Sequence, residues 1–166
     1  MIPEEPDVDA FLYALAAAVL AWQPVEKTLF LIFNFLVGPH KNPNVLSSVY
    51  HSVVNLNIRL TMIDGAAAVV LKGDPYLAEW EKLSKRVTKA AKNRNILVHF
   101  GLVRHKHSKG KPDSLRLEPS AYDVTEEPGL QYDLKQIREW HDSFIILWRD
   151  LNAFLDHLPP SLRSSP

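Results

Sequence analysis

The 166-residue sequence has no cysteine, no formal net charge, only six glycines and no uninterrupted apolar run as long as a membrane span. Without cysteine, the chain has neither disulfides nor Cys-ligated zinc, and a chain of this length needs neither to hold a core. It also lacks a glycine-rich phosphate loop, a nucleophile elbow and a zinc-protease motif, which excludes P-loop nucleotide hydrolysis. The 46% apolar content argues against global disorder and favours one globular domain.

The first residues and two apolar runs indicate whether the protein is secreted, inserted in a membrane or cytoplasmic. Residues 1–7 are acidic where a secretory signal needs positive charge, so no signal peptide is expected. The runs Ala10–Trp22 and Thr28–Gly38 are each too short to cross a bilayer, and the polar segment Gln23–Lys27 separates them. We therefore expect two helices, or one kinked helix, in a soluble core, and a cytoplasmic protein with no membrane partner. The strongly apolar segment Phe30–Val37 keeps a membrane span as an alternative.

The charges are segregated along the chain. Residues 81–116 carry eleven basic and two acidic side chains, a balance of +9, whereas residues 1–80 balance at −4 and residues 117–166 at −5. Such a block attracts polyanions, among which nucleic acid is the commonest partner. A solvated helix face followed by a basic loop is the alternative interpretation. The side chains expected to bind RNA are Lys85, Lys89, Lys92, Arg104, Lys106, Lys109, Lys111 and Arg116.

Helical spacing of apolar residues and cap residues predict a helical bundle. The predicted helix starts are Asp7, Asn42-Pro43, Asp74-Pro75 and Asp133, the last with Gln136 in a capping box. Pro24 should break or kink the first helix, and one apolar stripe from Leu46 to Leu71 predicts a single second helix. The spacing of Trp80, Trp140, Phe144 and Trp148 favours core packing over base stacking.

Alternating apolar and polar residues flank a turn at residues 110–113, which predicts a basic β-hairpin over residues 102–118. The expected fold is therefore all-α, a bundle of four to five helices with this hairpin inserted before the last helix. The predicted domain spans residues 7–158, and the tail 159–166 is expected to be disordered.

Three polar residues stand among apolar ones at the C-terminal end of the third predicted long helix. Asn95 and His99 are four residues apart and share a helix face, and the long side chain of Arg94 flanks them. Histidine titrates near neutral pH and can move the proton of a 2′-hydroxyl, and arginine can hold a phosphate. Alternatively, Arg94 pairs with Asp142 or Asp150 of the last helix, and His99 caps its own helix through the dipole.

The string Arg94-Asn95-Ile96-Leu97-Val98-His99 resembles the R-N-x-x-x-H motif of HEPN domains, a spacing that arises by chance in about one chain of this length in a hundred. The resemblance covers the layout of a HEPN-like helical bundle, but only these six residues in sequence. It implies a metal-independent endoribonuclease, often a toxin or defence factor of a toxin-antitoxin pair, that acts as a homodimer. By this resemblance His99 is the general acid or base, Arg94 binds the phosphate, and Asn95 orients the helix end or the substrate.

Other interpretations of the same residues remain open at this stage. HEPN-like modules without catalysis bind RNA, a nucleotide or a protein, and a purely structural oligomer subunit would hold Arg94 in a closed salt bridge. A metal site at His105-Lys106-His107 is disfavoured, since the basic neighbours repel a cation. We therefore expect no metal and no cofactor, with RNA, a second copy and a cognate antitoxin as candidate partners.

Overall fold

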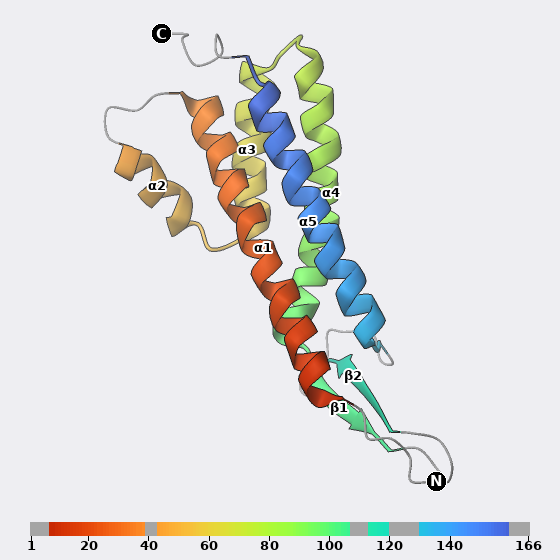
Figure 1. The fold of residues 1–166 in the computed structure, drawn as a ribbon. Coiled ribbons are helices and arrows are strands. Elements are labelled where there is room, and N and C mark those ends of the chain that lie inside the picture. Colours follow the sequence, from red (N-terminus) through yellow and green to blue (C-terminus); the bar gives the residue numbers. More distant parts are fainter. Residues whose placement is uncertain (1–6, 39–42, 107–112, 120–129, 160–166) are drawn as a thin grey trace. The chain divides into compact units, whose positions relative to one another are not determined.

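The computed structural model describes residues 7–38, 43–106, 113–119 and 130–159, which form five helices and one antiparallel two-stranded sheet (Figure 1). The predicted helical fold with a hairpin before the last helix is confirmed. The expected tail, from residue 160 onward, and the turn of the hairpin at residues 107–112 lie outside the described residues. The elements are α1 (Val8–Val37), α2 (Pro43–Ser52), α3 (Leu56–Val70), α4 (Pro75–His99), β1 (Gly101–His105), β2 (Ser114–Glu118) and α5 (Leu134–His157).

The chain divides into two compact units. Unit 1 consists of Met1–Trp22 and Lys92–Phe144, and unit 2 of Gln23–Ala91 and Ile145–Pro166. Unit 1 contains the hairpin and the Arg94-to-His99 motif, whereas unit 2 contains α2 and α3.

Helix α1 is a single helix of 30 residues, so the expected break at Pro24 does not occur. As predicted, Asp7 caps it: the Asp7 Oδ1 accepts a hydrogen bond from the Ala10 backbone N–H at 2.8 Å. The helix ends at Gly38, whose φ of +83° is a conformation that glycine adopts without steric cost. Burial of the apolar face explains why the helix tolerates a proline, since Val25 and Leu29 just beyond it are completely buried.

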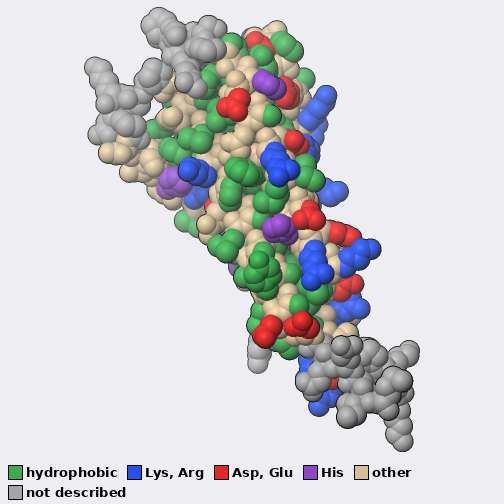
Figure 2. Space-filling view, viewed as in Figure 1, with side chains coloured by type: hydrophobic (Ala, Val, Ile, Leu, Met, Phe, Trp, Pro, Cys, Tyr) green, Lys and Arg blue, Asp and Glu red, His purple; other side chains and the backbone are tan. Residues whose placement is uncertain are grey.

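Among the described helices, α1 alone is long and apolar enough to cross a membrane, with a mean hydropathy of 1.5 over its best 18 residues. One-third of that window is buried within the protein, and core helices of soluble proteins meet the same criterion. The continuity of α1 removes the expectation that its two apolar runs are separate short helices. Figure 2, in the same orientation as Figure 1, shows apolar side chains at the surface on the face where α1 lies. The helix therefore gives only weak evidence for a membrane span.

The predicted second helix is two helices, α2 and α3, and this prediction was wrong. The Asn55 side chain accepts hydrogen bonds from the N–H groups of Asn57 and Ile58 and begins α3 as its N-cap. The Ser52 hydroxyl donates to the carbonyl of Val49 in the last turn of α2. These local hydrogen bonds from side chains compete with the backbone hydrogen bonds of a continuous helix, so the chain leaves the helical conformation between α2 and α3.

The starts of α4 and α5 agree with the sequence. The Asp74 carboxylate accepts from the Tyr76 N–H at 2.9 Å. Asp133 and Gln136 form the reciprocal capping box, in which the Gln136 N–H donates to Asp133 Oδ1 at 2.9 Å and the Asp133 N–H to Gln136 Oε1 at 3.0 Å.

Aromatic residues form the core of each unit. In unit 1, Trp22 and Phe144 meet edge to face with their ring centroids 5.2 Å apart. In unit 2, Trp80 packs against Phe154 at 5.8 Å, and its indole N–H donates to the Asp64 carboxylate at 2.8 Å. Trp140 and Trp148 depart from the expected core packing because each is only half-buried.

Candidate functional site

The motif residues occupy the last two turns of α4, in unit 1. Arg94 is half-buried, and Asn95 and His99 are exposed. The Arg94 Nη1 donates a hydrogen bond to Asn95 Oδ1 at 3.3 Å. Asn95 lies one helical turn before His99 on the same face, so the bond brings the guanidinium toward the face that carries the imidazole. The structure thus joins Arg94 to Asn95, and His99 follows one turn later on the face that carries Asn95.

The carboxylates that were alternative partners for Arg94 are paired with other residues. Asp150 pairs with Arg86 at 2.7 Å, and Asp142 accepts from His141 Nδ1 at 2.9 Å. Within the described residues Arg94 makes no ion pair. No described carboxylate therefore neutralises its positive charge, and a guanidinium of this kind can bind phosphate.

The His99 imidazole makes no hydrogen bond or ion pair with any described residue. The backbone around it is nevertheless fixed, because the Phe100 N–H continues the helix ladder to the Ile96 carbonyl at 3.0 Å. His99 is thus an exposed, unengaged imidazole on a well-formed helix end. That arrangement leaves both ring nitrogens available for proton transfer or for binding.

An aromatic anchor that the sequence did not indicate follows directly after His99. The ring of Phe100 packs on Tyr132 at 5.9 Å, and Tyr132 packs on Trp140 of α5 at 4.9 Å. Tyr132 also exchanges two backbone hydrogen bonds with Leu117 of β2, at 2.9 and 3.0 Å. These contacts tie the end of α4 to the hairpin and to the start of α5, and they fix the backbone beside His99.

The hairpin carries fewer available charges than its sequence suggests. The Arg104 guanidinium pairs with Asp113 at 2.9 Å, and Arg116 pairs with Asp133 at 3.1 Å. The strand register places Arg104 opposite Leu115 and Val103 opposite Arg116, so the two arginines point to opposite faces of the hairpin. They do not form one basic face.

The remaining cations predicted to bind RNA are distributed between the units. Lys92 and Lys106 are exposed in unit 1, and neither forms an ion pair with a described residue. Lys85 and Lys89 are exposed on the part of α4 that belongs to unit 2. Two further predicted residues, Lys109 and Lys111, lie outside the described residues. Of the eight cations predicted to bind RNA, Lys92 and Lys106 are thus the two described ones that lie in the same unit as the motif and make no ion pair with a described residue.

Metal-ligating side chains do not gather in groups of three or more within the part of the chain that the structure describes. The His105 Nε2 lies 2.5 Å from Glu118 Oε1, across the hairpin. This contact engages the imidazole of His105, the first histidine of the His105-Lys106-His107 string. The second histidine, His107, lies outside the described residues.

Comparison with known proteins gives no match to any family model, any curated protein or any solved structure. The HEPN resemblance therefore rests on the six motif residues, on their place near the end of a long helix and on the helical fold.

Proposed function

We propose that this protein is a HEPN-type, metal-independent endoribonuclease whose site contains Arg94, Asn95 and His99. The observation that carries the proposal is the presence, near one helix end, of an exposed imidazole and a guanidinium that make no ion pair with any described residue. The Asn95 amide holds that guanidinium at 3.3 Å, one helical turn before His99. RNA cleavage without a metal needs these two functions, proton transfer and stabilisation of phosphate charge.

The chemistry proposed is an internal transesterification. One His99 imidazole accepts the proton of a ribose 2′-hydroxyl while the 2′ oxygen forms a bond to phosphorus. The bond from phosphorus to the 5′ oxygen breaks, and that oxygen takes a proton from an imidazolium. The products are a 2′,3′-cyclic phosphate and a 5′-hydroxyl, and Arg94 stabilises the negative charge that develops on the phosphoryl oxygens.

One chain supplies one such histidine, and the reaction uses a base and an acid. We therefore propose a homodimer in which the His99 of a second copy supplies the other group. In this proposal the protein is cytoplasmic and acts as a toxin or defence factor, with a cognate antitoxin as partner. Lys92 and Lys106 add phosphate contacts beside the motif.

The proposal is tested with a labelled RNA in EDTA, comparing wild type with Arg94→Ala and His99→Ala. Loss of a general acid or base lowers the rate about 10²- to 10⁴-fold, and loss of the phosphate-binding group has a comparable effect. Matched controls are His157→Ala, an exposed histidine in the last turn of α5, and Arg138→Ala, an exposed arginine on α5. Both controls should cleave as wild type does.

Two outcomes would contradict the proposal. Cleavage by His99→Ala at the wild-type rate would assign the activity to other residues or to a contaminant. Salt-sensitive RNA binding without cleavage would make the same surface a non-catalytic RNA-binding module.

A further inference from the structure

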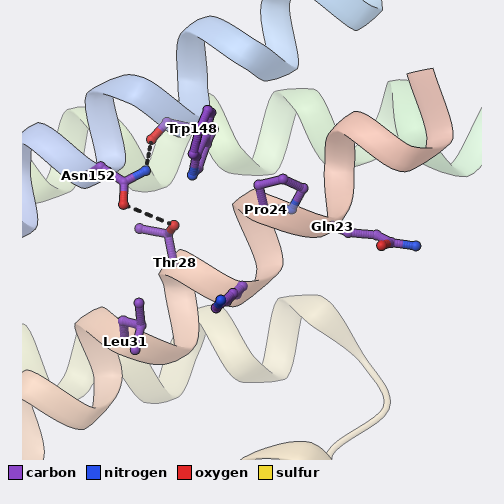
Figure 3. A pocket seen from close by; sticks show the side chains of 7 residues that line it. Gln23, Pro24, Thr28, Leu31, Trp148 and Asn152 are labelled. Carbon is purple, nitrogen blue, oxygen red and sulfur yellow. Dashed lines mark hydrogen bonds between the residues drawn. The ribbon is translucent and has the colours of Figure 1, made fainter. Parts of the chain in front are cut away.

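A cavity of about 560 Å³ opens between α1 and α5 in unit 2 (Figure 3). Its size falls within the range typical of small-molecule sites. The apolar part of its lining is made by Pro24, Leu31 and Trp148. Trp148 is half-buried and makes no ring-to-ring contact within the described residues, and it is the one aromatic side chain in this lining.

The polar part of the lining retains unused hydrogen-bonding capacity. The Thr28 hydroxyl, in a residue that is 2% exposed, donates to Asn152 Oδ1 at 3.4 Å, and Asn152 Nδ2 donates to the Trp148 carbonyl at 2.8 Å (Figure 3). One Nδ2 proton and one Oδ1 lone pair of Asn152 remain after these bonds. Gln23 adds a second, exposed amide at the rim.

Lys27 is the one charged residue in this lining, and it is exposed. The cavity therefore favours a ligand that is negatively charged at one end. The same ligand should be planar and apolar on its faces, and should carry hydrogen-bonding groups along an edge.

We propose that this cavity binds a nucleoside monophosphate unit, either free or within an RNA strand. The base stacks on the Trp148 indole, since aromatic side chains bind the flat face of any base. The Asn152 amide pairs with the base edge, as such amides do with adenine. The Lys27 ammonium contacts the phosphate.

This site lies in unit 2, whereas the Arg94-to-His99 motif lies in unit 1, and ligand binding here does not depend on RNA cleavage. The two proposals therefore fail separately. Nucleotide binding is measured in the His99→Ala protein, which under the proposed function cleaves RNA about 10²-fold or more slowly.

Isothermal titration with AMP, adenosine and ribose 5-phosphate tests the proposal. AMP should bind more tightly than either fragment, because only AMP has both the base and the phosphate. Trp148→Leu should weaken AMP binding about tenfold or more, as the loss of one stacking contact predicts. Lys27→Gln should weaken AMP binding and leave adenosine binding unchanged, whereas Lys82→Gln, an exposed lysine on α4, should change neither.

A second measurement needs no substitution in the cavity. In the His99→Ala protein, AMP should shift the indole N–H resonance of Trp148, and a short RNA should displace AMP if the cavity takes nucleotides within a strand. RNA that leaves bound AMP in place would restrict the ligand to the free nucleotide. Equal affinity for ribose 5-phosphate and AMP, or an unmoved Trp148 resonance at millimolar AMP and RNA, would overturn the proposal.

Discussion

Tyr50 of α2 has a buried hydroxyl without a hydrogen-bond partner within the described residues, and its replacement by phenylalanine should stabilise the protein. The residue is 1% exposed, and its ring packs against Phe30 at 5.2 Å and Phe33 at 5.3 Å. Tyr50→Phe keeps these ring contacts and removes a hydroxyl that loses its hydrogen bonds to water when the protein folds. Because an unsatisfied buried polar group costs about 1–3 kcal/mol, we expect the variant to be about 1 kcal/mol more stable at neutral pH.

Tyr50 should also make the free energy of unfolding depend on pH. Burial raises the pKa of Tyr50 to about 12 from an ordinary value of 10, although the Arg59 guanidinium, 5.3 Å from the ring, opposes the rise. The folded state thus favours the neutral phenol, and this contribution is complete below pH 10 and is lost as the pH rises toward 12. The full loss is about 2 to 3 kcal/mol, of which about 1 kcal/mol should be gone by pH 11.

The assay is urea unfolding of wild type and Tyr50→Phe at pH 8, 9, 10 and 11. The advantage of the variant should be constant up to pH 9 and should grow by about 1 kcal/mol by pH 11. Tyr13→Phe, at a tyrosine that is 79% exposed, should change stability by less than about 0.5 kcal/mol. A Tyr50→Phe protein that is less stable than wild type, or whose advantage does not vary with pH, would refute the reasoning.

Three further predictions concern a helix cap, a buried indole and a surface cation. Gln136→Ala removes one half of the capping box with Asp133 and should cost about 1 kcal/mol in the free energy of unfolding. Trp80→Phe removes the indole N–H that donates to Asp64 at 2.8 Å and should cost about 2 kcal/mol in urea unfolding. Lys106→Ala should reduce the slope of log affinity for single-stranded RNA against log salt by about 0.7, since it removes one phosphate contact.

Each of these has a clear contrary result. A Gln136→Ala protein as stable as wild type would show that the cap is replaced by solvent. If a double-mutant cycle with Asp64→Ala shows no coupling energy, the hydrogen bond from the Trp80 indole to Asp64 does not contribute to stability. An unchanged salt slope in Lys106→Ala would place the RNA away from the end of β1.

The helix starts could be predicted because their determinants are local. Asp7, Asp74 and Asp133 each act on backbone N–H groups two or three residues ahead, so the sequence next to each one contains the signal. The break at Asn55 depends on the same chemistry. It was missed because the apolar spacing from Leu46 to Leu71 is also compatible with one helix.

Tertiary contacts explain the other differences. Burial of its apolar face keeps α1 continuous through Pro24, and no local pattern reports that burial. The spacing of Arg94, Asn95 and His99 was enough to predict their positions on α4. The ion pair between Arg116 and Asp133 joins segments that are distant in sequence, so the spacing of residues could not predict it. Trp140 and Trp148 share the helical spacing of the core aromatics but are only half-buried, and the spacing alone does not distinguish them from the buried Trp80 and Phe144.

The central claim is that His99 performs acid–base cleavage of RNA without a metal. Mass spectrometry of the fragments formed in EDTA tests it most directly, with wild type and His99→Ala purified in the same way. The account predicts 2′,3′-cyclic phosphate and 5′-hydroxyl ends from wild type, and the same fragments formed about 10²-fold or more slowly by His99→Ala. Fragments with 3′-hydroxyl and 5′-phosphate ends, or fragments formed at the same rate by both proteins, would contradict it.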